Sequence, residues 1–291
     1  MILIADSGST KSDWVAISQN STIRYSTVGI NPYFHDEEFV FSAIKDNQSL
    51  YSISSQIEEV YFYGAGCSSE KLNSIVLRGL QKVFTQAEIH VDHDLSACAL
   101  ATYQGEPGIS CIIGTGSNSC FYDGTNIFES IPALGYILGD EGSGAYFGKK
   151  LLADFLYNKL PENIHFSLQN DLGLDKEKII SNVYMKPGAN VYLASFMPFI
   201  FSHFDDKYIS NMILEGFKTF IDTHVRCYQD YTKYKVHFIG SIACLFQKEL
   251  DQACQFYNVT LGQVIKKPID GLADYHMKME LVKIENNERI N

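Results

Sequence analysis

The sequence lacks a long uninterrupted apolar run and has a single tryptophan. Its longest apolar stretch, Tyr192 to Phe201, is interrupted by Pro198, and the tryptophan is Trp14. A stretch of this length is too short to cross a bilayer, so we expect no membrane-spanning segment. Because a strand-like run starts at Met1, we expect no signal peptide either. We interpret Trp14 as a packing residue.

Positive charge and paired cysteines are also scarce. The 23 basic residues are outnumbered by 34 acidic ones, which gives a formal net charge of −11. This sign opposes binding to nucleic acid or to an anionic membrane surface. The seven cysteines are scattered and include no C-x-x-C pair, which is typical of reduced thiols. We therefore expect a cytoplasmic globular protein with a small-molecule partner.

Two segments resemble each other and indicate an internal repeat. The first runs from Ile2 to Ile17 and the second from Cys111 to Tyr122. Each consists of an apolar strand, a turn of small residues centred on Gly8 or Gly116, and a second strand. This pattern predicts two copies of one folding unit, each opening with a glycine-rich β-hairpin.

Predicted strands and helices alternate along the rest of the chain. The expected strands are 60–63, 89–91 and 236–239; the expected helices are 69–84, 95–103, 142–157, 208–231 and one starting near 242; residues 158–190 are expected to be irregular. The alternation predicts an α/β fold with mixed sheets flanked by helices. The cluster Gly105-Glu-Pro-Gly108 predicts a boundary, with domains at 1–107 and 108–291. In an alternative, the last helix packs back on the N-terminal domain.

Both hairpin turns have the residues of a phosphate-binding loop. Successive backbone N–H groups in such turns can cradle phosphate oxygens, and small residues let the ligand approach the backbone. The predicted phosphate-binding residues are Gly8, Ser9, Thr10 and Lys11 in the first turn and Gly114, Thr115 and Gly116 in the second. Asp6 is predicted to hold a hydrated Mg²⁺. An ordinary tight hairpin explains either turn equally well.

Four motifs occur in order along the chain. They are Asp6-Ser-Gly-Ser-Thr-Lys11, Gly114-Thr-Gly-Ser-Asn118, Gly139-Asp-Glu-Gly-Ser-Gly144 and Phe238-Ile-Gly-Ser-Ile-Ala243. Together they resemble the N-acetylglucosamine kinase and BadF/BadG/BcrA/BcrD ATPase family, within the superfamily of actin, Hsp70 and hexokinase, over residues 2 to 277. The resemblance implies two ribonuclease-H-like domains with ATP in a cleft between them. It also implies that Gly240 and Ser241 contact the nucleotide.

Several polar residues compete for the chemical roles. Transfer of a phosphoryl group to a hydroxyl needs a carboxylate base. The resemblance favours Asp94, although Asp94 could equally cap a helix, and Asp92 competes for the role. By resemblance Asn31 and Asp140 contact the sugar, yet Asn31 could start a turn before Pro32 and Asp140 could cap a helix. Two further residues, Ser117 and Asn118, are also predicted to contact the substrate.

The resemblance implies phosphorylation of an amino sugar, N-acetylglucosamine or a relative, by ATP and Mg²⁺. The family's Gly-Gly-Trp-Gly-like run is replaced here by Ala133-Leu-Gly-Tyr-Ile-Leu138, which leaves the identity of the sugar open. The alternative function is a BadF-type ATPase that acts on a protein partner without a sugar acceptor. A homodimer with an aromatic interface is compatible with the 18 tyrosines and 19 phenylalanines.

Overall fold

The computed structural model describes residues 1–8, 11–18 and 21–290, with side chains up to residue 279. The chain divides into two compact units. Unit 1 consists of Met1–Gln104 and Lys267–Asn291, and unit 2 of Gly105–Lys266. The first break falls at the start of the glycine- and proline-containing cluster. The C-terminal segment, in the range expected for the second domain, belongs to unit 1.

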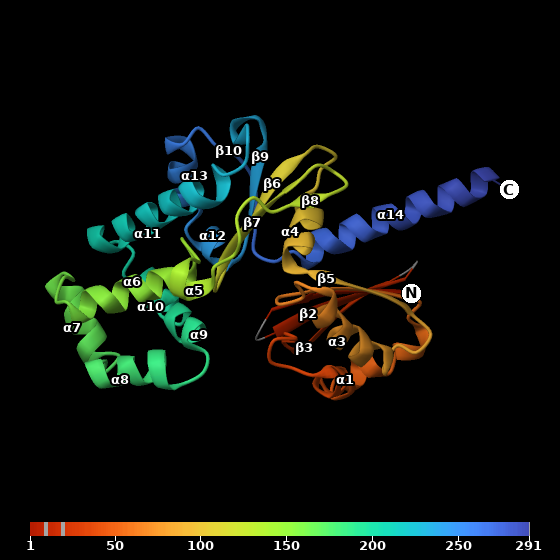
Figure 1. The fold of residues 1–291 in the computed structure, drawn as a ribbon, viewed down its shortest axis with the longest axis horizontal. Coiled ribbons are helices and arrows are strands. Elements are labelled where there is room, and N and C mark those ends of the chain that lie inside the picture. Colours follow the sequence, from red (N-terminus) through yellow and green to blue (C-terminus); the bar gives the residue numbers. More distant parts are fainter. Residues whose placement is uncertain (9–10, 19–20, 291) are drawn as a thin grey trace. The chain divides into compact units, whose positions relative to one another are not determined.

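Unit 1 is built on one mixed sheet with helices packed on its faces (Figure 1). Its elements are β1 (Ile2–Ser7), β2 (Lys11–Ile17), β3 (Thr22–Val28), α1 (Glu37–Lys45), α2 (Gln48–Tyr51), a 3₁₀ turn (Ser54–Gln56), β4 (Glu59–Gly64), α3 (Glu70–Gln81), β5 (Glu88–His93), α4 (Asp94–Thr102) and α14 (Ile269–Ile290). The strand order is β3-β2-β1-β4-β5. Strands β1, β2 and β3 pair antiparallel, whereas β4 and β5 extend the sheet in parallel.

Alternation of side chains along β1 gives unit 1 two apolar layers. Leu3 belongs to the cluster that contains residues of α1 and α3, such as Val40 and Leu80. Ile4 points to the other face, where Leu272 of α14 belongs to its cluster. Successive strand residues face opposite sides of a sheet, so a strand with both faces buried is apolar throughout. Trp14 is fully buried and donates a hydrogen bond to Thr27 Oγ1 at 2.9 Å, which confirms its packing role.

The last helix, α14, packs against α4, β1 and β2 of unit 1. The approach is close at Gly271, where an added Cβ would lie 2.3 Å from the carbonyl oxygen of Ala101. Glycine therefore permits contact between the backbones of the two helices. Within the part of the chain that the structure describes, no helix combines the length and apolar character needed to cross a membrane.

Unit 2 contains a second five-stranded sheet and most of the helices. Its elements are β6 (Gly108–Ile113), β7 (Ser117–Tyr122), β8 (Ile127–Phe128), α5 (Gly135–Leu138), α6 (Gly144–Leu156), α7 (Glu162–Asn170), α8 (Lys176–Ile180), a π-helical turn (Ser181–Met185), α9 (Ala189–Ala194), α10 (Met197–Ser202), α11 (Lys207–Phe220), a second π-helical turn (Ile221–Val225), a 3₁₀ turn (Tyr231–Lys233), β9 (Lys235–Ile239), α12 (Ser241–Leu245), α13 (Gln247–Phe256) and β10 (Thr260–Ile265). The strand order is β10-β9-β6-β7-β8. Read from the β8 edge, it repeats the order of unit 1: three antiparallel strands come first, and two parallel strands follow. The predicted α/β fold with mixed sheets is confirmed.

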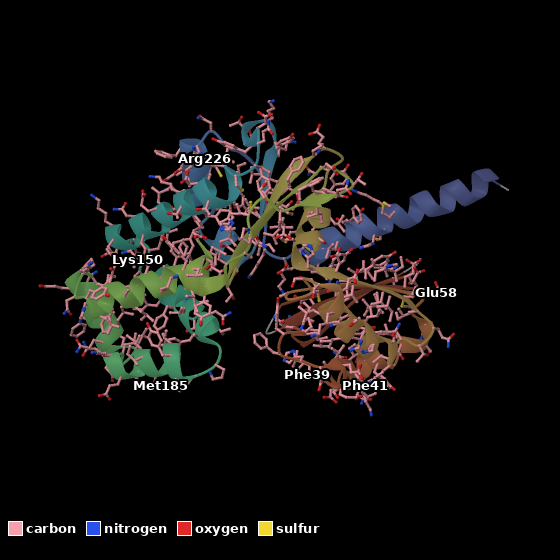
Figure 2. The ribbon with its side chains drawn as sticks, in the orientation of Figure 1. Phe39, Phe41, Glu58, Lys150, Met185 and Arg226 are labelled. Carbon is pink, nitrogen blue, oxygen red and sulfur yellow. The ribbon has the colours of Figure 1, made fainter. Side chains whose placement is uncertain are left out.

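Two expectations about the helices of unit 2 are wrong. Residues 158–190 contain α7, α8 and a π-helical turn, and Met185 at the end of that turn is labelled in Figure 2. These short helices each bury only a few apolar side chains, such as Leu168 and Ile179, so the sequence periodicity is weak. The predicted helix 208–231 ends as α-helix at Phe220 and continues only as a π-helical turn.

Candidate functional site

The turn of the first hairpin is held by hydrogen bonds within the hairpin and to the segment that follows β3. Its turn is closed by a hydrogen bond from the Gly8 N–H to the Lys11 carbonyl oxygen at 3.0 Å. The hydroxyls of Ser7 and Ser12 lie 2.6 Å apart, and Ser7 Oγ accepts a hydrogen bond from the Ile30 N–H at 2.9 Å. Two predicted phosphate-binding residues, Ser9 and Thr10, lie outside the described residues.

Two carboxylates lie beside this turn, and the charge of a third acts on one of them. Asp6 and Asp13 face each other in the register of β1 and β2. Burial, followed by the negative charges of Asp13 and Asp94, raises the pKa of Asp6 to about 7. Asp13 also forms ion pairs with two lysine side chains. Its Oδ1 lies 2.8 Å from Lys11 Nζ, and its Oδ2 lies 2.5 Å from Lys267 Nζ. The predicted residues Asp6, Lys11 and Asp94 are therefore close in unit 1.

Asp94 is the first residue of α4 and does not cap it. The capping residue is His93, whose Nδ1 accepts a hydrogen bond from the Leu95 N–H at 3.2 Å. The N-cap interpretation of Asp94 is thus wrong, although its negative charge at the start of α4 complements the helix dipole. Asp92 is exposed and accepts a hydrogen bond from the His93 N–H at 2.8 Å.

Asn31 forms a turn, as one of its two interpretations predicted. Its Oδ1 accepts a hydrogen bond from the Tyr33 N–H at 3.0 Å, and its carbonyl oxygen accepts from Phe34 and His35. Gly66 lets a neighbouring loop approach, because a Cβ there would lie 2.4 Å from Asn31 Oδ1. A sugar contact by Asn31 stays a prediction.

The second hairpin rests on the first turn of α6. Its turn is closed by a hydrogen bond from the Gly114 N–H to the Gly116 carbonyl oxygen at 2.9 Å. The N–H groups of Gly144 and Ala145 donate to the carbonyl oxygens of Gly114 and Thr115, at 2.9 and 3.0 Å. Because two N–H groups at the start of α6 are used in this way, the helix fixes the hairpin in place.

Asp140 is held against the second hairpin. It has a left-handed backbone with φ of 56°, and its Oδ1 accepts a hydrogen bond from the Ser117 N–H at 3.2 Å. Gly116 makes room for this contact, because a Cβ there would lie 2.9 Å from Asp140 Oδ2. Burial raises the pKa of Asp140. The capping interpretation is wrong, since Ser143 caps α6.

The end of β9 brings Gly240 beside the same hairpin. Gly240 has φ of 133°, and a Cβ there would lie 2.1 Å from the Ile113 carbonyl oxygen and 3.2 Å from the Gly114 nitrogen. Ser241 follows as the exposed first residue of α12. Asn118 accepts a hydrogen bond from the Ser119 N–H through its own Oδ1 at 2.8 Å. The predicted nucleotide and sugar residues of unit 2 therefore surround one turn.

The residues of unit 1 are compatible with a hydrated magnesium ion. The structure supplies carboxylate oxygens, the donors that Mg²⁺ prefers, at Asp6 and Asp13. Burial, with repulsion from Asp13 as a smaller cause, raises the pKa of Asp6, and a bound cation would favour its ionised form. Among the described residues, no group of three or more His, Cys, Asp or Glu could enclose a metal. Two carboxylates would suit an ion that keeps most of its waters, as Mg²⁺ usually does.

Two features of the site were not found from the sequence. Asp13 and Lys267 join the group around Asp6, and His224 contacts Glu141 beside Asp140. The position of Asp13 follows from hairpin register once the turn is placed. Contacts with Lys267 and His224 depend on tertiary packing, which left no local signal.

A solvent-open hollow of about 260 Å³ lies elsewhere on unit 2. It is formed by α6 and α11, and Lys150 on its rim is labelled in Figure 2. Lys150 pairs with the buried Asp154 at 2.7 Å. The described residues that line this hollow include none of the predicted site residues.

Solved structures resemble this chain over nearly its whole length, whereas no protein-family model and no curated protein matches it. A proposed N-acetylglucosamine kinase from Porphyromonas gingivalis is 37% identical, with a TM-score of 0.90 over 95% of this chain and 98% of that one. A second proposed N-acetylglucosamine kinase, from Chromobacterium violaceum, is 15% identical, with a TM-score of 0.74 over 94% of this chain and 98% of that one.

A more distant structure has the same fold. The ROK-family glucokinase of Streptomyces griseus, solved with glucose and AMPPNP, is 15% identical, with a TM-score of 0.50 over 94% of this chain and 97% of that one. At this identity the likeness concerns the fold alone. It agrees with the predicted actin-like arrangement of two mixed sheets flanked by helices.

Proposed function

We propose that this chain, which belongs to the N-acetylglucosamine kinase family represented by the Porphyromonas gingivalis protein, phosphorylates N-acetylglucosamine or a closely related amino sugar. It is an ATP-dependent sugar kinase of the actin, Hsp70 and hexokinase superfamily. The observation that carries the proposal is the 37% identity across 95% of the chain. The ordered motifs at both hairpins support it.

Unit 1 supplies the base in this proposal. The sugar hydroxyl oxygen bonds to the γ-phosphorus of ATP, the bond from that phosphorus to the ADP oxygen breaks, and the hydroxyl proton passes to Asp94. The start of α4 holds Asp94 beside the first hairpin, where Asp6 would bind hydrated Mg²⁺. The metal, when bound, shields the charge of the phosphates. Gly8 and Lys11 would contact phosphate oxygens.

Unit 2 supplies contacts to both substrates. The turn at Gly114–Gly116 and the neighbouring Gly240, which packs against it, would approach the nucleotide through backbone atoms. Asp140 would accept hydrogen bonds from sugar hydroxyls, because the Ser117 N–H fixes its carboxylate. Asn118 on β7 and Asn31 of unit 1 are proposed as further sugar contacts.

The proposal is tested by ADP release from MgATP with N-acetylglucosamine, N-acetylmannosamine, glucosamine and glucose. We expect turnover to depend on added sugar and kcat/KM to be highest for an N-acetylated amino sugar. Preference for glucose would correct the substrate and leave a sugar kinase. ADP release that no sugar stimulates would contradict the proposal.

Asp6→Asn is expected to raise the Mg²⁺ concentration needed for half-maximal turnover by about tenfold, because the carboxylate that holds the hydrated ion loses its charge. The measurement is a Mg²⁺ titration of kcat at a fixed ATP concentration. Asp46→Asn, at the end of α1, is the control with the same chemical change. Equal Mg²⁺ requirements in wild type and Asp6→Asn would remove Asp6 from the metal site.

A further inference from the structure

A buried histidine contacts the turn that carries Asp140. His224 lies in the π-helical turn after α11 and is only 3% exposed. Its Nε2 lies 3.0 Å from Glu141 Oε2, and because a carboxylate accepts hydrogen bonds, Nε2 is the donor. Glu141 directly follows Asp140 in the chain. His224 therefore fixes the residue next to a proposed sugar ligand.

The same histidine is tied to the second hairpin through its backbone. The His224 carbonyl oxygen accepts a hydrogen bond from Ser119 Oγ at 2.6 Å, and Ser119 is on β7. The Ser117 hydroxyl, at the start of β7, donates to the Glu141 carbonyl oxygen at 2.7 Å. These bonds join the Gly139–Gly142 turn, β7 and the π-helical turn in a closed network.

Packing alone does not explain a histidine at this position. The His224 ring stacks on Phe220 with centroids 4.8 Å apart, a contact that an apolar ring would also make. Its Nδ1 is buried and, among the described residues, has no hydrogen-bond partner. Burying a polar atom without a partner is unfavourable, so Nδ1 of this side chain lowers the stability of the fold. The contact that uses its polarity is the one with Glu141.

We propose that His224 is a positioning residue: through Glu141 it holds the Gly139–Gly142 turn so that the Asp140 carboxylate stays in place for the sugar. This inference rests on the proposed function, because it takes Asp140 as a sugar ligand. His224 does not touch the substrate in this account. Its loss would affect sugar binding before nucleotide binding.

The test compares four purified variants with wild type. His224→Leu removes the donor and keeps an apolar side chain, whereas His224→Gln keeps an N–H donor, and Glu141→Gln weakens the acceptor. His237→Leu is the matched control, because His237 is also buried in unit 2 and its Nδ1 accepts a hydrogen bond from the Gln263 N–H at 3.1 Å. We measure KM for the sugar, KM for MgATP, kcat and thermal stability.

His224→Leu is expected to raise the KM for the sugar by about 10-fold to 100-fold and to leave the KM for MgATP unchanged. The reason is that the substitution displaces only the Asp140 carboxylate, the proposed contact to the sugar. His224→Gln should restore the sugar KM, and Glu141→Gln should raise it. His237→Leu should lower the melting temperature without this selective change. An unchanged sugar KM in His224→Leu, or the same change in His237→Leu, would overturn the inference.

Amide hydrogen exchange at Ser117, measured without substrate, separates this inference from the proposed function. The Ser117 N–H bonds Asp140 Oδ1, so its exchange reports on whether that carboxylate is held. We expect faster exchange in His224→Leu and none of that acceleration in His237→Leu, even if wild type does not use the sugars tested. Equal exchange in wild type and His224→Leu would reject the positioning role.

Discussion

Asp94→Asn is expected to lower kcat for sugar phosphorylation by about 10²–10⁴-fold, because an amide cannot accept the hydroxyl proton during phosphoryl transfer. Asparagine has nearly the shape of aspartate, and α4 is capped by His93, so the helix should stay intact. Binding of MgATP should therefore persist. The measurements are kcat from ADP release and nucleotide affinity by calorimetry.

Asp92→Asn is the matched control for this experiment. Asp92 is two residues from Asp94, is exposed, and contacts its neighbour His93 through the backbone N–H at 2.8 Å and through the ring Nε2 at 4.0 Å. Its substitution should leave kcat close to that of wild type. Loss of turnover in Asp92→Asn with activity retained in Asp94→Asn would transfer the role of base to Asp92.

Gly240→Ala is expected to lower the free energy of unfolding by about 2–4 kcal/mol. Two physical effects combine at this position. The φ of 133° is strained for any residue with a side chain, and the new Cβ would lie 2.1 Å from the Ile113 carbonyl oxygen. A backbone atom cannot rotate away, so β9 or the second hairpin must shift. Urea denaturation followed by circular dichroism measures the loss.

Gly114→Ala is the control in the same region. Among the described residues, an added Cβ at Gly114 meets nothing within 4 Å. We expect a change in unfolding free energy of about 0.5 kcal/mol or less, of either sign. If Gly240→Ala proved as stable as Gly114→Ala, the close approach of β9 to the second hairpin would be incorrect.

Local sequence pattern was sufficient for the hairpins and the strand-to-helix turns. The motifs around Gly8 and Gly116 predicted two hairpins, and both occur at the start of equivalent sheets. Glycine at position 240 likewise marked a turn whose φ of 133° residues with a side chain rarely adopt. These turns depend on residues that are adjacent in the chain. The types of those residues decide which backbone conformations are sterically allowed.

Features that depend on tertiary contacts were missed or misread. The helices in residues 158–190 are short, and each contributes too few buried residues to give a clear period. The cap of α6 was placed at Asp140 as one option, whereas Ser143 performs it and leaves Asp140 to bond Ser117. Nothing near His224 in the chain indicates its contact with Glu141.

Transfer of a phosphoryl group to the sugar is detected by mass spectrometry of the sugar after incubation of the wild-type protein with MgATP and N-acetylglucosamine. We expect a product that carries one added phosphoryl group, formed in equal amount to ADP, because the sugar hydroxyl is the acceptor. Formation of ADP and inorganic phosphate with the sugar unchanged would contradict it.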